Sequence, residues 1–167
     1  MYYTVPVLWA VENRVTAGTS ATTFGPNDGC TRAQVVTFLW RAAGQPEPTG
    51  NRNPFTDVSA SAYYYKAVLW AVENGITAGT SATTFSPDGT CTRAQIVTFL
   101  WRYEGMPAPA SAGNSFVDVP TGAYYEKAVL WAAESNVTAG TSATTFSPDS
   151  TCTRAQVVTF LYRDVKK

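Results

Sequence analysis

The stretch Phe85–Arg102 reads FSPDGTCTRAQIVTFLWR, and closely similar strings begin at Phe24 and Phe146. The string TAGTSATTF, which ends at the first phenylalanine of each copy, is unchanged in all three. These strings recur at an interval of 61 residues, beginning at Thr16, Thr77 and Thr138. A fixed period is the mark of tandem structural repeats, so the three copies are expected to fold alike.

The middle copy shows what one repeat is expected to form. Tyr63–Asn74 carries aromatic and aliphatic residues at helical spacing, which predicts a first helix. Ser86–Gly89 (SPDG) combines proline, which fixes φ, with glycine, which permits positive φ, and therefore predicts a turn. Thr92–Gln95 (TRAQ) fits a capping box that starts a second helix with an apolar stripe. Each repeat is therefore predicted to be a helix, an ordered loop and a second helix.

Three such units fill the chain. Repeat 1 spans residues 1–44, repeat 2 residues 55–105 and repeat 3 residues 116–167, with linkers rich in proline, glycine, alanine and serine between them. A unit this small rarely folds alone, so the three are expected to bury their apolar stripes against one another. The predicted fold is mainly α, with three helix–loop–helix repeats packed as one three-pronged, pseudo-threefold helical bundle. An open row of three helical hairpins is the alternative.

The composition argues against several functional classes. Lys plus Arg and Asp plus Glu both number 12, which gives no basic face for nucleic acid or an anionic membrane. No stretch approaches the roughly 18 apolar residues of a membrane helix, and the N-terminus has no signal-peptide pattern. The chain has no histidine for a nucleophile system, and Glu12, Glu73 and Glu134 supply one carboxylate per repeat. The chain is therefore expected to be no enzyme and to need no cofactor.

The order of short motifs around repeat 2 carries a resemblance. FTDV (Phe55–Val58) precedes a helix that ends in NGITAG, and a phenylalanine–proline turn and a TRA helix start follow. In this order and in triplicate, the motifs resemble the S-layer homology domain, usually found as three tandem copies on bacterial surface proteins. The family's usual Thr-Arg-Ala-Glu appears here as Thr-Arg-Ala-Gln. The resemblance implies a three-pronged helical body whose inter-repeat grooves bind secondary cell wall polysaccharide, with the motif arginine contacting the carboxylate of a pyruvyl ketal.

The function implied by this resemblance is a non-covalent anchor in the cell wall or S-layer at the bacterial surface. The chain would then be part of a larger surface protein. The alternative is a protein-interaction or self-assembly module built on the same repeats, without glycan binding. A signal peptide and further domains upstream would favour the anchor.

The arginine of each TRAQ motif follows a helix N-cap, where backbone amides and the helix dipole favour an anion. A guanidinium there predicts a carboxylate site with two parallel charged hydrogen bonds. The alternative is that each arginine pairs with an acid such as Asp57 or Asp118 and braces the fold. Gln in place of Glu keeps the capping box and removes a negative charge beside the arginine. The candidate ligand-binding residues are Arg32, Arg93, Arg154, Gln34, Gln95, Gln156, Asp57, Asp118, Tyr63 and Tyr124.

Other repeated residues are assigned mainly to the core. The three tryptophans and the tyrosine pairs that begin at Tyr2, Tyr63 and Tyr124 are possible sugar-stacking platforms. The tryptophans are at helical spacing and are expected to be mostly buried, whereas Tyr63 and Tyr124 stand where the family usually has a groove tryptophan. The three cysteines precede the N-caps, and a metal site on the axis is conceivable. Without histidine or a C-x-x-C motif, buried free thiols are the favoured interpretation. These core residues are Trp9, Trp70, Trp131, Cys30, Cys91 and Cys152.

Repeat 1 departs from the other two at its start. FTDV and FVDV (Phe116–Val119) precede repeats 2 and 3, whereas the matching segment of repeat 1 would lie before Met1. The first helix is expected to begin near Pro6, because proline is tolerated only in a first turn. Arg14 stands where the other repeats have glycine or asparagine at the helix end. Arginine is expected to be less favourable than these residues in the left-handed conformation that commonly ends a helix. Arg32 is expected to matter less for binding if the groove of repeat 1 depends on the segment before Met1, whereas a groove shared between neighbouring repeats would keep its contribution.

Overall fold

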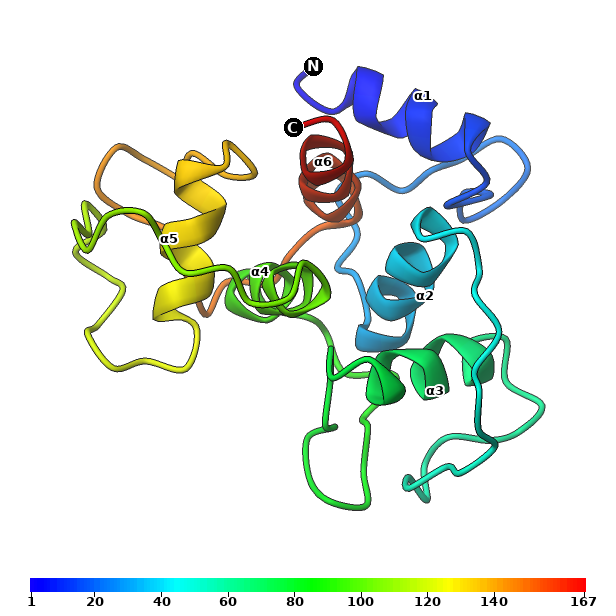
Figure 1. The fold of residues 1–167 in the computed structure, drawn as a ribbon. Helices are drawn as coiled ribbons and strands as arrows, with labels where there is room; N and C mark the ends of the chain where they lie inside the picture. The colour runs from blue at the N-terminus through cyan, green and yellow to red at the C-terminus, as the bar shows by residue number, and fades with distance from the viewer.

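Six helices form the regular structure of the chain in a computed structural model that describes all 167 residues. They are arranged in three lobes around a common centre (Figure 1). The predicted mainly α, three-pronged bundle is confirmed. The helices are α1 (Thr4–Glu12), α2 (Arg32–Ala42), α3 (Tyr65–Glu73), α4 (Arg93–Tyr103), α5 (Glu126–Glu134) and α6 (Arg154–Val165).

The helices pair across the boundaries between repeats. The second helix of each repeat (α2, α4 or α6) lies nearer the centre, and the first helix of the next repeat packs against it. Thus α3 lies on α2 and α5 lies on α4. In the third lobe α1 lies on α6, which brings the two chain ends side by side and closes the ring (Figure 1). This contact excludes the open row of hairpins.

Three backbone hydrogen bonds join the repeats at the centre. The Cys91 amide donates to the Cys30 carbonyl (N···O 2.8 Å), the Cys152 amide to Cys91 (2.8 Å), and the Cys30 amide to Cys152 (3.0 Å). The bonds form a closed triangle, so each repeat donates to one neighbour and accepts from the other. All three thiols are free and fully buried, as predicted for small apolar side chains.

The first helices differ in how well they are covered. Trp70 and Trp131 are buried, as predicted, whereas Trp9 is half-buried against the ring of Tyr162 on α6 (centroids 5.7 Å apart). Pro6 is the third residue of α1 and so lies in its first turn, where a missing amide costs no intrahelical hydrogen bond. The helix therefore begins just before this proline and has the same nine residues as α3 and α5.

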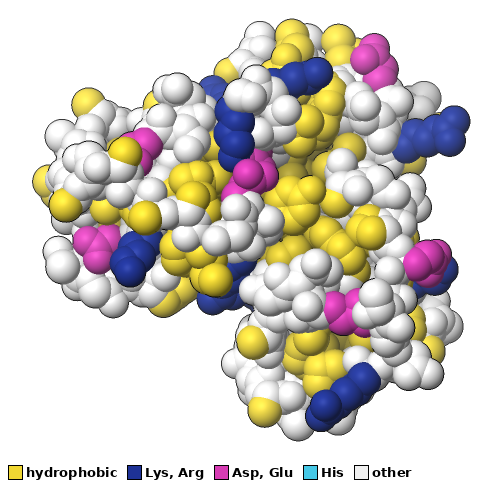
Figure 2. All heavy atoms as spheres, viewed as in Figure 1, with side chains coloured by type: hydrophobic (Ala, Val, Ile, Leu, Met, Phe, Trp, Pro, Cys, Tyr) yellow, Lys and Arg dark blue, Asp and Glu magenta, His cyan; other side chains and the backbone are white.

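None of the helices has both the length and the hydropathy needed to cross a bilayer. On the face drawn in Figure 2, basic and acidic side chains occur singly or in small groups, without a broad basic area.

Arg14, the second residue after α1, is strained because it has a side chain in the left-handed conformation. Arg14 has a φ of 58°, close to the 67° of Gly75 after α3. A side chain costs about 1–2 kcal/mol in this left-handed conformation, and the larger entropy that glycine loses on folding offsets part of the gain from removing it. Arg14→Gly is therefore expected to raise the free energy of unfolding by about 0.5–1 kcal/mol, as measured by urea unfolding. Arg14→Ala keeps the Cβ and should show no gain, so an equal gain in both variants would contradict a backbone origin.

Burial of the central thiols makes the stability of the fold depend on pH. Burial raises the pKa of Cys30 and of Cys91 from 9.0 to about 12, and it also raises the pKa of Cys152. The folded chain therefore holds these protons more tightly than the unfolded chain does. The resulting stabilisation is fully present below the unfolded-state pKa and is lost as the pH rises through the folded-state pKa.

Valine at all three cysteine positions is expected to remove this loss of stability at alkaline pH. Above about pH 9, the unfolding free energy of the native chain should fall more steeply than that of the variant, by up to about 1.4 kcal/mol per thiol per pH unit. Urea unfolding followed by tryptophan fluorescence measures both slopes, and tyrosine ionisation contributes equally to the two chains. Equal slopes would contradict this account. Stoichiometric zinc in the native chain, or failure of Cys91→Val to fold, would contradict the apolar role of the thiols.

Candidate binding grooves

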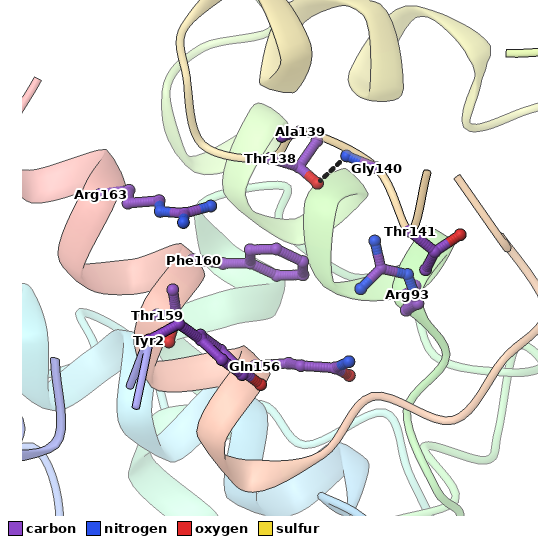
Figure 3. Close-up of a pocket in the computed structure, with 10 residues that line it drawn as sticks. All are labelled: Tyr2, Arg93, Thr138, Ala139, Gly140, Thr141, Gln156, Thr159, Phe160 and Arg163. Atoms are coloured by element: carbon purple, nitrogen blue, oxygen red, sulfur yellow. Dashed lines mark hydrogen bonds between the residues drawn. The ribbon is translucent and has the colours of Figure 1, made fainter. Parts of the chain in front are cut away.

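Three equivalent grooves lie on the surface between the lobes, one beside the second helix of each repeat. Figure 3 shows groove 3, in which the ring of Phe160 lies between Arg163 of α6 and Arg93 of α4. The loop before repeat 3's TRAQ helix lines one side, and Tyr2 enters from the start of the chain. Groove 3 thus combines residues of all three repeats. Its lining is Tyr2, Arg93, Thr138–Thr141, Gln156, Thr159, Phe160 and Arg163.

Grooves 1 and 2 repeat this composition. In each, the TRAQ arginine comes from the preceding repeat around the ring and the tyrosine from the following one. Their volumes of about 420 and 320 Å³, with about 360 Å³ for groove 3, fall in the lower range of small-ligand sites. Groove 1 is lined by Thr16–Thr19, Gln34, Thr37, Phe38, Arg41, Tyr63 and Arg154. Groove 2 is lined by Arg32, Thr77, Gly79, Thr80, Gln95, Thr98, Phe99, Arg102 and Tyr124.

The TRAQ arginines are buried between phenylalanine rings. The Nε of Arg93 donates to the Phe146 carbonyl (2.8 Å), and its Cζ lies 4.8 Å and 5.4 Å from the ring centroids of Phe146 and Phe160. Arg93 is 4% exposed, yet its Nη2 has no hydrogen-bond partner within the protein. Arg32 and Arg154 are buried in the same way, each with its Nε on a phenylalanine carbonyl at 2.8 Å.

The arginines have no acidic partner. Every ion pair in the chain involves a lysine, and none joins an arginine to Asp57 or Asp118. The alternative that each arginine braces the fold by pairing with an acid is therefore wrong in its partner. Carbonyl oxygens and aromatic rings hold the guanidinium instead. Burial lowers the pKa of Arg32 and of Arg93, but arginine still stays charged in proteins. Each site therefore keeps a cation without a counter-charge.

A second arginine lies in every groove, and sequence reasoning missed it. Arg102 donates one Nη1 hydrogen bond to the Ile76 carbonyl (3.2 Å), and Arg41 and Arg163 do the same to their own loops (both 3.3 Å). Their other N–H groups remain available. A signal was present, because these arginines recur at the same interval of 61 residues in the last turn of each second helix. No aspartate or glutamate lines any of the three grooves.

The helix N-termini do not contribute to these sites as expected. The Arg93 and Ala94 amides donate to the carbonyls of Ser150 and Pro148 in the neighbouring repeat (both 2.9 Å). The Gln95 amide is occupied by the N-cap hydroxyl (3.2 Å), and the predicted capping box is confirmed in all three repeats. The expectation that these backbone amides favour an anion is therefore wrong, because the turn of the next repeat already satisfies them.

The other candidate residues divide into two groups. Gln95 accepts the N-cap amide with its Oε1 (3.1 Å), which leaves its NH₂ group for the groove. The structure places Tyr63 and Tyr124 at the rims of grooves 1 and 2, exposed to solvent. Tyr2 has the same place in groove 3; it aligns with the other two tyrosines but was not among the candidate ligand-binding residues.

Asp57 and Asp118 lie outside the grooves. Asp118 accepts the amides of Phe146 and Ser147 (2.8 and 2.7 Å), and Asp57 does the same in repeat 2. Desolvation acts to raise the pKa of Asp118, but these amide hydrogen bonds outweigh it and hold the pKa below its ordinary value. The Phe146 carbonyl accepts a hydrogen bond from Arg93. By fixing the backbone at Phe146 and Ser147, Asp118 therefore positions the carbonyl that holds Arg93.

Together these contacts define a triplicated helical module with three arginine-lined grooves. Two guanidinium groups, hydroxyls and an exposed tyrosine, with no acid nearby, suit a ligand that carries both carboxylates and hydroxyls. Residues 2–36, 54–97 and 115–158 match the S-layer homology domain, and the chain belongs to this family.

Similar proteins are much longer than this chain. The chain is 32% identical over 160 residues, 93% of its length, to the surface-layer 125 kDa protein of Lysinibacillus sphaericus, of which it covers 13%. It is 33% identical over 114 residues, 66% of its length, to a cell surface protein of Thermoanaerobacter kivui, of which it covers 15%. It is also 38% identical over 91 residues, 54% of its length, to an endoglucanase of Bacillus sp. (strain KSM-635), of which it covers 9%.

Proposed function

We propose that the chain attaches a larger protein non-covalently to a bacterial cell wall by binding an anionic wall polysaccharide in its grooves. Membership of the S-layer homology family supports this, as do relatives named as surface-layer and cell surface proteins. The observation that carries the proposal is the buried guanidinium of Arg93, whose Nη2 has no partner and which lies across the ring of Phe160 from Arg163 (Figure 3). A buried charge without a partner is costly, so an anionic ligand would satisfy it.

The ligand class we propose is a secondary cell wall polysaccharide with carboxylate substituents such as pyruvyl ketals. A carboxylate can accept two parallel hydrogen bonds from guanidinium groups. The NH₂ group of Gln156 and the hydroxyl groups beside it can bind sugar hydroxyls, and the exposed ring of Tyr2 can lie against a sugar face. Because this binding uses opposite charges at a partly open site, it should weaken as salt is added.

The proposed location is the bacterial cell surface, within an S-layer or wall. In this proposal the chain contributes binding and no catalysis. The activity named for the Bacillus endoglucanase belongs to that protein, of which the match covers 9%.

Co-sedimentation with purified wall sacculi tests the proposal. The chain should pellet with intact sacculi and stay in solution once the secondary polymer has been removed chemically. Sacculi treated with mild acid, which hydrolyses ketals, test the carboxylate substituent separately. Equal pelleting with intact and stripped sacculi would remove the glycan hypothesis, and equal pelleting with intact and acid-treated sacculi would remove the pyruvyl ketal.

A further inference from the structure

In repeats 2 and 3, an extended segment precedes the first helix and docks on its lobe. These lead-in segments are Thr49–Val58 and Ala110–Val119. The first two amides of Thr49–Val58 donate to the carboxylate of Glu73 on α3 (2.9 and 2.7 Å). The first two amides of Ala110–Val119 donate in the same way to Glu134 on α5 (both 2.8 Å). One glutamate thus holds the start of each lead-in segment.

The end of each lead-in segment is the Phe-x-Asp-Val motif. The carboxylate of Asp57 accepts the amides of Phe85 and Ser86 (both 2.8 Å). The ring of Phe55 packs on the ring of Phe85, with centroids 5.7 Å apart. The same contacts recur in repeat 3. The motif therefore fastens to the loop that leads to the TRAQ helix.

Between these ends, the outer face of the first helix is covered in repeats 2 and 3. Leu69 and Leu130 are 4% and 8% exposed, and Leu130 shares a pocket with residues of its lead-in segment. The equivalent Leu8 on α1 is 57% exposed, and Val5 and Val11 beside it are exposed as well. Hydrophobic side chains accordingly reach the surface at the top of Figure 2, where Figure 1 places α1.

Repeat 1 has the groups equivalent to those that bind a lead-in segment in repeats 2 and 3, but no segment of the chain covers them. The carboxylate of Glu12, equivalent to Glu73, makes no hydrogen bond or ion pair. The amides of Phe24 and Gly25, equivalent to those that hold Asp57, donate to no acceptor. The side chain of Phe24 is half-buried, whereas its equivalents in the other repeats are fully buried.

We propose that this face of repeat 1 is a docking site for an extended Phe-x-Asp-Val segment supplied from outside residues 1–167. Both segments of this kind within the chain are already docked on repeats 2 and 3, so neither can fill the site without leaving its own. The occupant is fixed by complementarity. Its leading amides meet Glu12, its middle covers Leu8, its phenylalanine packs on Phe24, and its aspartate accepts the amides of Phe24 and Gly25.

A synthetic peptide with the sequence of Pro46–Ala60 tests this proposal, with isothermal titration calorimetry as the readout. One peptide is expected to bind per chain and to raise the melting temperature. Replacing the peptide's phenylalanine by alanine, or its aspartate by asparagine, should weaken binding by about tenfold or more. In the protein, Leu8→Ser and Glu12→Gln should weaken it, while the matched Glu134→Gln should not, because Glu134 is already occupied.

A fusion removes the dependence on peptide affinity. Residues Pro46–Ser61, joined directly before Met1 so that the register of repeat 2 is kept (Met1 aligns with Ala62), should raise the melting temperature above that of a fusion with both peptide substitutions. No binding by the free peptide together with equal melting temperatures of the two fusions would overturn the proposal. A dimer of the unfused chain that Leu8→Ser dissociates would also overturn it, because a second copy would then occupy the face. Wall binding is a separate readout, so loss of that function leaves this test unchanged.

Discussion

Replacing Arg41, Arg102 and Arg163 together by glutamine is expected to weaken binding to an anionic wall polysaccharide by about tenfold to a hundredfold per groove. Each variant groove loses a charged donor to a carboxylate. Folding should be nearly unaffected, because these side chains reach solvent and each makes one long bond of 3.2–3.3 Å to a carbonyl. Binding to purified polymer and the melting temperature, measured on the same samples, separate the two effects.

The TRAQ arginines are expected to behave differently. Arg93→Gln should weaken binding by a similar factor and also lower the melting temperature, because the side chain lies between two rings and donates to the Phe146 carbonyl. Arg32 is expected to matter as much as Arg93, because groove 2 is built from repeats 2 and 3 besides this arginine. From the sequence, Arg32 is expected to matter less only if the groove of repeat 1 depends on a segment before the first helix, and the lining of groove 2 matches the alternative of a groove shared between repeats.

A double variant away from the grooves controls for loss of charge. Arg14→Gln with Arg52→Gln removes two exposed cations that line none of the three grooves. This variant should keep its affinity for the polymer. If it loses affinity as strongly as the groove variants do, the effect comes from net charge and the grooves have no special role. Unchanged affinity of the groove triple variant would equally contradict arginine-mediated binding.

Gly79→Ala is expected to destabilise the fold by about 1.5–4 kcal/mol, combining the net left-handed strain with overpacking. The glycine has a φ of 86°, and an added Cβ would lie 2.4 Å from the Thr84 carbonyl oxygen and 2.5 Å from the ring of Phe55. Neither neighbour can move freely, because the carbonyl belongs to the loop and Phe55 is buried in the core. Thermal unfolding should show a fall of roughly 2–4 °C for each kcal/mol.

Gly105 provides the matched control for backbone strain alone. It has a φ of 82°, but nothing lies within 4 Å of an added Cβ. Gly105→Ala should therefore cost only the left-handed strain less the entropy that alanine saves, about 0.5–1 kcal/mol. Gly18→Ala should fall between the two, because its Cβ would also meet a loop carbonyl but no phenylalanine ring. Equal losses at Gly79 and Gly105 would show that the close approach of Phe55 does not limit this position.

Local features of the chain could be predicted from sequence because each is decided within a few residues. The capping box at Thr92 and Gln95 closes inside one helical turn, and the turn Ser86–Gly89 closes through its own Gly89 amide and Ser86 carbonyl. The left-handed conformation of Arg14 followed from its alignment with glycine and asparagine. Burial of the cysteines followed from their repetition without partners. Triplication then implied a pseudo-threefold body, because no single repeat can bury its own stripe.

Only the tertiary structure decided which groups meet in a groove. The ring closes by contacts between residues far apart in sequence, such as the Arg154 amide on the Asp28 carbonyl. This cyclic arrangement places each TRAQ arginine beside the second helix of the next repeat, brings in a second arginine, and occupies the helix amides that were expected to bind an anion. It also left Asp57 and Asp118 behind the grooves as supports for the loops. The sequence by itself determined the repeating unit, because propensity and capping are local. The sites depend on how units pack, which is set by the shape of surfaces that only the folded ring brings together.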